Sequence, residues 1–137
     1  MKATMKRLLN FFLAFSLAIL LSDLDILANV IAGEAPYCPQ DHQIAVAAVV
    51  FNRVCDPRFP DTVAGVVGQE GQYSERYLEP MELPAGCLEA AEKALNGEYD
   101  IPLDVIYQAN FPQGTETWWI SEVDTGYWHS TTYFCRG

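Results

Sequence analysis

The chain has 137 residues, of which 50% are hydrophobic and 12% aromatic, and this length and composition fit one domain with its own packed core. It has 18 acidic and only 8 basic residues, which gives a net charge of -10 at pH 7. Such an excess of negative charge excludes nucleic acid and acidic membrane surfaces as expected partners, and the high hydrophobic content argues against a disordered chain.

The first 21 residues have the pattern of an export signal. Lys2, Lys6 and Arg7 precede an apolar run over positions 8–21, in the manner of a signal-peptide n-region and h-region. The run is about 14 residues long, short of the ~20 that span a bilayer as a helix. We therefore expect residues 1–21 to direct export and residues 22–137 to form the exported domain. An uncleaved membrane anchor and a buried N-terminal helix are the alternatives.

Four helices are expected next. A short one begins at Ser22, which is followed by apolar residues at helical spacing, and ends at Ala32. Gly33 is expected to terminate it, which places Glu34 at or just past its C-terminal end. The other three predicted helices are a central one from Asp41 to Val54, a short piece from Thr62 to Val67 capped by Asp61, and an amphipathic one from Cys87 to Leu95, with residues 68–84 as a loop.

The last third of the chain changes to strand-like patterns. Residues 105–109 and 118–121 are rich in β-branched and aromatic side chains and flank a Pro/Gly turn, and residues 131–135 make a third candidate strand. Helices followed by strands predict an α+β fold, with a small antiparallel sheet attached to a helical body.

The cysteine count is even, in a chain that carries an export pattern. We therefore predict two disulfides, with all three pairings open. The spacing contains no CxxC or Cys/His ligand pattern, so we expect no metal and no cofactor. The candidate disulfide residues are Cys38, Cys55, Cys87 and Cys135.

Several short motifs occur in an order that resembles the SleB-type cell wall hydrolases, a family that includes spore-cortex-lytic enzymes. The stretch around Arg58, Gly65 and Gly71 is similar to the family's "RFPNTIxGVIxxxGQFS", with Tyr73 at the position of the usual Phe. The other matching stretches are Ala32-Gly-Glu-Ala35, Gln43-Ile-Ala-Val-Ala-Ala-Val-Val-Phe-Asn-Arg-Val54 and the helix that ends in Leu95-Asn-Gly97. Near the C-terminus, Thr132 stands where the family carries a histidine.

The resemblance implies a lysozyme-like α+β domain that cleaves peptidoglycan between N-acetylmuramic acid and N-acetylglucosamine, commonly as a lytic transglycosylase. It also implies that Glu34 is the catalytic acid. The residues add a physical reason, because Val30 and Ile31 can desolvate its carboxylate and the helix C-terminus disfavours a negative charge. Both effects predict a raised pKa for Glu34, as a proton donor to a glycosidic oxygen requires.

A second catalytic carboxylate is not evident in the sequence. Asp41, Glu70 and Glu75 are the candidates, and none of them belongs to a motif that points to the role. Ordinary glycosidases need such a partner. In a lytic transglycosylase the C6 hydroxyl of muramic acid attacks instead, and Glu34 serves first as acid and then as base. The missing partner therefore favours lytic action over hydrolysis.

Two further groups of residues are expected to contact the sugar. One lies on the loop after the short helix, and the other provides amides and aromatic faces on the predicted sheet. Adjacent residues of a strand point to opposite faces, so at most one of the two tryptophans is expected to stack on substrate. The predicted contact residues are Gln72, Tyr73, Ser74, Tyr107, Gln108, Asn110, Trp118 and Trp119.

Two residues are expected outside the site. His42 is predicted at the surface, and Arg53 is predicted to bond carbonyls at the end of its helix. The chain is expected to act as a monomer on peptidoglycan outside the cytoplasm, in the cell wall or on the outer side of the membrane. It would touch the membrane only through an uncleaved N-terminal segment. The alternative function is a secreted carbohydrate-binding module of the same fold, with Glu34 idle.

Overall fold

The computed structural model describes residues 21–137, so the predicted export segment lies outside the described residues except for Leu21. The structure has a helical body and a three-stranded sheet, which confirms the α+β prediction. Within residues 21–137 no helix has the length and apolar character needed to cross a membrane. The elements are α2 (Asp23–Glu34), α3 (Gln40–Cys55), α4 (Val63–Val67), the 3-10 helix η1 (Glu75–Leu78), α5 (Cys87–Leu95), β1 (Val105–Ala109), β2 (Thr117–Asp124) and β3 (His129–Arg136).

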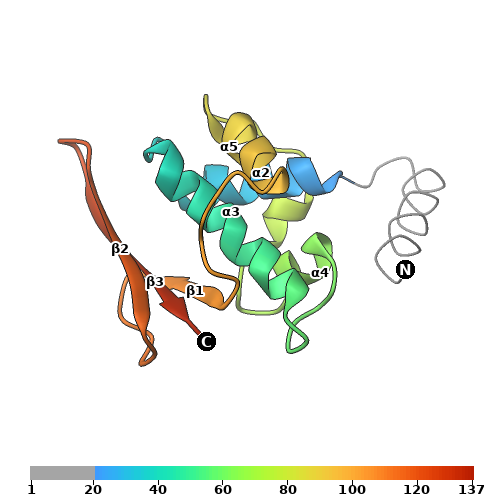
Figure 1. Ribbon diagram of the computed structural model, residues 1–137. Coiled ribbons are helices and arrows are strands. Elements are labelled where there is room, and N and C mark those ends of the chain that lie inside the picture. The colour runs from blue at the N-terminus through green and yellow to red at the C-terminus, as the bar shows by residue number, and fades with distance from the viewer. Residues whose placement is uncertain (1–20) are drawn as a thin grey trace.

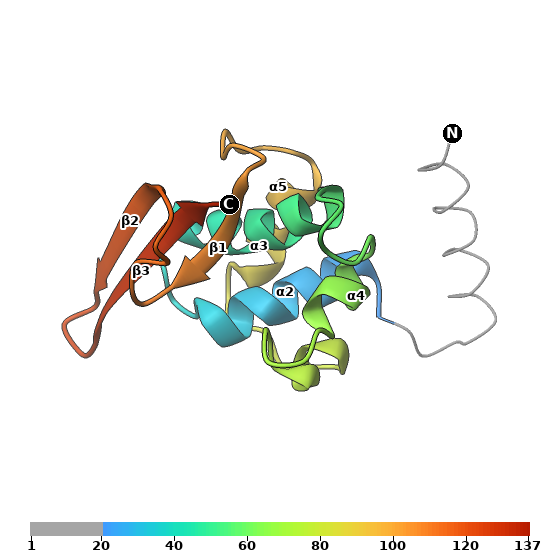
Figure 2. The same ribbon diagram turned by 90° about the horizontal axis from the view of Figure 1, so that it is seen from below.

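The sheet stands at one end of the molecule, and the helices gather at the other (Figure 1). Its strand order is β1-β3-β2, and both pairings are antiparallel. Helix α3 contacts β1 of the sheet as well as α2 and α5, and the view from below shows α2 and α3 side by side (Figure 2). The sheet therefore contacts the helical body mainly through α3.

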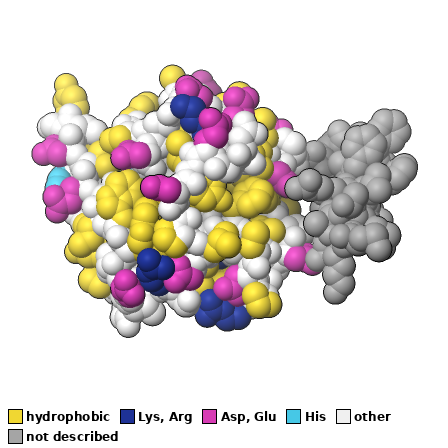
Figure 3. Space-filling model, viewed as in Figure 1, with side chains coloured by type: hydrophobic (Ala, Val, Ile, Leu, Met, Phe, Trp, Pro, Cys, Tyr) yellow, Lys and Arg dark blue, Asp and Glu magenta, His cyan; other side chains and the backbone are white. Residues whose placement is uncertain are grey.

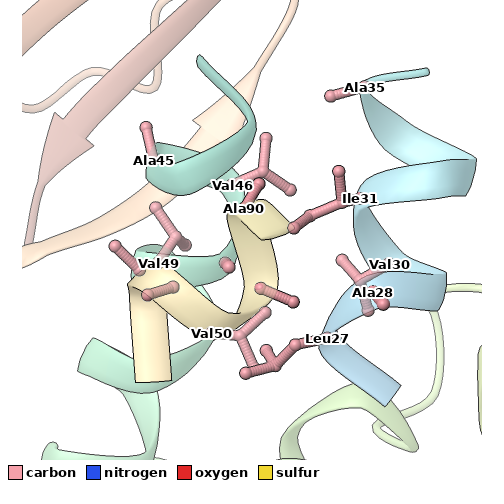
Figure 4. Packing of buried hydrophobic residues seen from close by; sticks show 14 of the residues in the cluster. Leu27, Ala28, Val30, Ile31, Ala35, Ala45, Val46, Val49, Val50 and Ala90 are labelled. Atoms are coloured by element: carbon pink, nitrogen blue, oxygen red, sulfur yellow. The ribbon is translucent and has the colours of Figure 1, made fainter. Parts of the chain in front are cut away.

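The core forms where α2, α3 and α5 meet (Figure 4). Leu27 and Ile31 of α2 face Val46 and Val50 of α3, and all four side chains are almost completely buried. Helix α5 contributes small residues such as Ala90, so its backbone approaches the other two closely. This packing fixes the direction of α2, and with it the position of the residue at its C-terminal end.

The helix predictions hold with small shifts at the ends. Ser22 caps α2 as predicted, because its hydroxyl accepts a hydrogen bond from the amide of Asp25. The cap of α4 is Thr62 rather than Asp61, since the Thr62 hydroxyl accepts a bond from the amide of Gly65 at 2.9 Å. The predicted loop over residues 68–84 contains the short helix η1, which the sequence did not indicate.

The predicted disulfides are not present, because all four cysteines are free thiols. Cys135 is buried in β3, with its sulfur 3.6 Å from the Thr117 hydroxyl. Cys55 is exposed at the end of α3. Cys38 and Cys87 interact electrostatically, and burial together with this neighbour raises the pKa of the Cys38 thiol. The even cysteine count was therefore a poor guide to covalent bonds in this fold.

Candidate active site

Glu34 is the last residue of α2 and is exposed to solvent. Its Oε1 accepts a hydrogen bond of 3.3 Å from the hydroxyl of Tyr77. The surrounding protein desolvates the carboxylate and raises the pKa of Glu34, and the bond from Tyr77 opposes this only in part. A carboxyl whose pKa is raised at an exposed position is suited to carry a proton to a bound molecule.

Tyr77 lies directly against the last turn of α2. A Cβ atom on Gly33 would lie 2.1 Å from the Tyr77 hydroxyl oxygen and 2.2 Å from a ring carbon, so only glycine leaves room for this ring. Gly33 lies inside α2, which continues to Glu34, so the prediction that Gly33 ends the helix is wrong. Burial and the charge of Glu34 raise the pKa of Tyr77 to about 12, which keeps its hydroxyl a donor.

Asn29 of α2 fixes the backbone that carries Tyr77. Its buried side-chain amide donates to the carbonyl of Tyr77 at 2.9 Å and to that of Glu79 at 2.8 Å. Helix α2 thus supplies the carboxyl, the space for the neighbouring ring and the support for the neighbouring chain.

Replacing Gly33 with alanine is expected to displace Tyr77 and to lower the free energy of unfolding by about 1–3 kcal/mol, as overpacking of a tight contact does. Urea denaturation measures this loss. In a Tyr77→Ala background the same change should lose its penalty, because the obstructing ring is gone. Equal penalties in the two backgrounds would show that the ring is not what excludes a side chain at Gly33.

Tyr73 places a second hydroxyl within electrostatic reach of Glu34. The Tyr73 hydroxyl is buried and has no hydrogen-bond partner among the described residues. Burial raises its pKa to about 12, Arg53 opposes that shift, and Glu34 adds to it. A buried polar group without a partner is unfavourable, so this hydroxyl is a donor in need of an acceptor.

Arg53 joins the loop that carries Tyr73 to the sheet. Its Nε donates to the carbonyl of Ile106 in β1 at 2.7 Å, and its Nη1 donates to Oε1 of Gln72 at 3.1 Å. The guanidinium also lies 5.1, 5.6 and 5.9 Å from the ring centres of Phe59, Tyr73 and Tyr107. Arg53 was predicted to bond carbonyls of its own helix. The carbonyl that it bonds belongs to a strand, a pairing that helix patterns alone cannot reveal.

The predicted contact residues separate into groups. Gln72, Tyr73 and Tyr107 meet around Arg53, and Tyr73 connects them electrostatically to Glu34. The other predicted contacts are more scattered. Ser74 is exposed before η1, and its side chain makes no capping bond. Gln108 in β1 has a buried Oε1 without a partner among the described residues, and Asn110 is exposed after β1.

Trp118 and Trp119 line a cavity of about 420 Å³ that does not include Glu34. Their rings meet edge to face, with centroids 6.3 Å apart. The prediction that they point to opposite faces of the sheet is wrong, because the register of β2 against β3 shifts between Thr117 and Trp119. A bulge of this kind inserts one residue and changes the direction of its side chain.

No second carboxylate among residues 21–137 influences the pKa of Glu34. Asp41 accepts a bond from the amide of His42 at 2.8 Å and lines the cavity of the two tryptophans. Glu70 and Glu75 are exposed on the loop before and at the start of η1. Within the same residues, no group of three His, Cys, Asp or Glu side chains is placed to hold a metal ion.

His42 is buried, contrary to the prediction that it lies at the surface. Its Nδ1 lies 2.7 Å from the hydroxyl of Ser121, and its ring packs edge-on against Trp119 and Phe134. The sheet covers this part of α3, which the helix pattern could not show. Burial lowers the pKa of His42, despite the opposing charge of Asp41.

The lowered pKa of His42 predicts a loss of stability in mild acid. The unfolded chain binds a proton near pH ~6.5 and the folded chain only at lower pH, so unfolding is favoured as the pH falls through that window. The slope should reach at most about 1.4 kcal/mol per pH unit. Urea denaturation at several pH values should find the slope reduced in His42→Gln. The exposed His129→Gln is the control, and an equal reduction there would contradict the assignment.

Comparison with known proteins identifies similar sequences and structures. The sequence profile of the cell wall hydrolase family matches residues 38–134, a range that begins four residues after Glu34. The chain is 34% identical over 102 residues to a spore cortex-lytic enzyme of Oceanobacillus iheyensis, with 71% of this chain and 36% of that protein covered. For the spore cortex-lytic enzyme of Bacillus subtilis the identity is 33%, and the coverage is 71% and 32%. The chain thus spans about a third of the length of the curated relatives it matches.

The solved structures cover more of the fold. The catalytic domain of the germination-specific lytic transglycosylase SleB from Bacillus anthracis is 30% identical, with a TM-score of 0.59, and the match covers 83% of this chain and 93% of that domain. The catalytic domain of the Bacillus cereus SleB protein is 27% identical with a TM-score of 0.62, and 83% and 89% are covered. The helical body and the small sheet are therefore similar to those of catalytic domains of known structure.

Proposed function

The chain belongs to the cell wall hydrolase family, and from this we propose that it cleaves the glycan strands of peptidoglycan between N-acetylmuramic acid and N-acetylglucosamine as a lytic transglycosylase. The solved relative from Bacillus anthracis is described as a lytic transglycosylase. The observation that carries the proposal is Glu34, a solvent-accessible carboxyl with a raised pKa that receives a hydrogen bond from Tyr77.

In the proposed reaction, Glu34 donates its proton to the glycosidic oxygen while positive charge develops on the muramic acid ring. The carboxylate that remains then accepts the proton of the muramic acid C6 hydroxyl, which attacks the anomeric carbon and closes a 1,6-anhydro ring. Every proton that Glu34 gives in the first step returns in the second. The scheme needs one carboxyl, in agreement with the absence of a second one acting on Glu34 among residues 21–137.

Gln72 and Tyr73 are the proposed contacts to the sugar beside Glu34. The bond from Arg53 holds the Gln72 side chain by its oxygen, which leaves the amide hydrogens for an acceptor outside the protein. The Tyr73 hydroxyl is buried, so a sugar would reach this second donor only after a local rearrangement of the loop. The carbonyl oxygen of an N-acetyl group is an acceptor of the kind that the Gln72 amide requires.

Mass spectrometry of digested peptidoglycan tests the reaction type. We expect fragments that end in 1,6-anhydromuramic acid, which form only when the C6 hydroxyl attacks. Reducing muramic acid ends would instead show hydrolysis by water. Intact glycan strands, together with binding to the wall, would favour the alternative of a carbohydrate-binding module.

The proposal includes the place of action. Peptidoglycan lies outside the cytoplasmic membrane, and residues 1–21 have the pattern of an export signal or anchor. Residues 22–137 would form the catalytic domain and act there as a monomer. Fractionation of cells that express residues 1–137 tests the place of action, and recovery of the protein only from the cytoplasm would contradict it.

A further inference from the structure

The cavity of about 420 Å³ beside Trp118 and Trp119 is separate from the group of residues around Glu34. Three parts of the chain form it: the start of α3, the segment after α5 and the first half of β2. Its lining consists of Asp41, Ile44, Glu98, Tyr99, Asp100, Ile101, Trp118 and Trp119. The lining thus combines three aromatic rings with three carboxylates, and it contains no lysine or arginine.

The two tryptophan rings form a corner. Their planes are inclined by 76° to each other. One face of Trp119 is covered by the ring of Phe134, with which it stacks at an interplanar angle of 14°. Tyr99 lines the same cavity. Aromatic faces set at an angle to one another attract a positive charge placed between them, because each face carries negative charge density.

The carboxylates strengthen this preference. Glu98 and Asp100 are exposed, and neither forms an ion pair with a cation of residues 21–137. Lys93, on neighbouring α5, is engaged with Gln40 at 2.7 Å and Glu89 at 3.4 Å. Across the face seen in Figure 3, acidic side chains lie among the hydrophobic ones. A negatively charged ligand would be repelled from the cavity, and an ammonium group would be attracted.

The bulge in β2 is a separate observation that points to the same place. A regular strand would direct Trp118 and Trp119 to opposite faces. The register shift between Thr117 and Trp119 brings both rings to one cavity instead. Bulges often redirect a side chain at a binding site, so the strand departs from regular pairing where the corner is formed.

We propose that the cavity formed by Trp118, Trp119, Tyr99, Glu98 and Asp100 binds a primary ammonium group of the cell wall polymer. The assignment rests on the proposed function for the source of this group. Two parts of peptidoglycan carry the required chemistry: the diamino acid of the stem peptide and an amino sugar that has lost its acetyl group. Either would hold the polymer at a second point away from Glu34.

Binding of small probes to the Glu34→Gln protein, residues 1–137, tests the site without turnover. The probes are a lysine-containing stem tripeptide and a glucosamine tetrasaccharide, each compared with its N-acetylated form. In NMR titrations we expect the indole N–H signals of Trp118 and Trp119 to shift while that of Trp128 does not. At least one free-amine probe should bind roughly tenfold more tightly than its acetylated form. The better of the two identifies the source.

Substitutions separate the charge effect from folding. The double variant Glu98→Gln, Asp100→Asn should lose most of the preference for the free amine, while its circular dichroism spectrum stays unchanged. The matched control is Glu122→Gln, Asp124→Asn, which removes the same charge from exposed positions farther along β2 and should keep the preference.

Equal binding of free and acetylated probes would overturn the proposal. So would no binding, or a preference that survives in the Glu98/Asp100 variant. These outcomes are distinct from a failure of the proposed function. Absence of anhydromuramic products from wild-type digests would reject lytic transglycosylation and leave the ammonium site standing.

Discussion

Replacing Glu34 with glutamine is expected to reduce glycan cleavage by about 10²–10⁴-fold, the range over which a positioned general acid contributes. Glutamine has nearly the same shape and can still accept the bond from Tyr77, but it has no proton to donate to a glycosidic oxygen. Release of anhydromuramic fragments from purified peptidoglycan measures the loss. Wall binding should be retained, because none of the proposed contacts to the sugar is altered.

The pH dependence gives an independent test of the same group. Because desolvation raises the pKa of Glu34, the acid form persists above the ordinary carboxyl range, and activity should fall as the pH rises through the raised value. The folded chain binds this proton more tightly than the unfolded one, so Glu34 lowers stability above that pH. The Glu34→Gln variant should therefore be at least as stable as the wild type at neutral pH. An active variant, or an unfolded one, would contradict the assignment.

Replacing Arg53 with alanine is expected to lower the free energy of unfolding by about 2–5 kcal/mol. The guanidinium is buried and makes a charge-assisted bond to the Ile106 carbonyl, each such bond contributing about 1.5–3 kcal/mol. Its contacts with aromatic rings add about 0.5–2 kcal/mol. The loss is a large part of the total for a domain of this size, and urea denaturation measures it.

Two matched variants define the cause of this loss. Arg53→Lys keeps the charge but loses the planar fork that reaches both Ile106 and Gln72, so its stability should be intermediate. Arg58→Ala removes an arginine that is exposed and paired with Asp56, and it should leave the urea midpoint almost unchanged. If Arg53→Ala and Arg58→Ala had equal effects, Arg53 would not be the link between loop and sheet.

Much of the fold could be predicted because its local patterns are strong. The residue bounds of α5 and β1 are those expected from periodicity, and Ser22 caps α2 as its side chain suggested. The misplaced residues share one cause, which is packing between distant parts of the chain. The sequence predicts Gly33 as a helix terminator because its position shows nothing of Tyr77, 44 positions later, whose ring requires that glycine.

The residues of the candidate site could also be predicted only in part. Motif resemblance selected Glu34, Gln72 and Tyr73, which the structure connects through Arg53 and electrostatic contact. The sequence does not predict Arg53 as part of the site, because a helix-end arginine more often bonds local carbonyls. Tyr77 was missed altogether: it lies in η1, a single turn too short to give a periodic signal. The bulge at Trp118 was equally invisible, since register is a property of two strands together.

The buried amide of Asn29 has a mechanical consequence. By bonding two carbonyls of the segment that carries Tyr77, it makes that segment move with α2. The distance between the Tyr77 hydroxyl and the Glu34 carboxyl is then set within one rigid unit. A shift of the sheet relative to α2 would therefore leave the hydrogen bond between Tyr77 and Glu34, and the part of the Glu34 pKa that depends on it, unchanged.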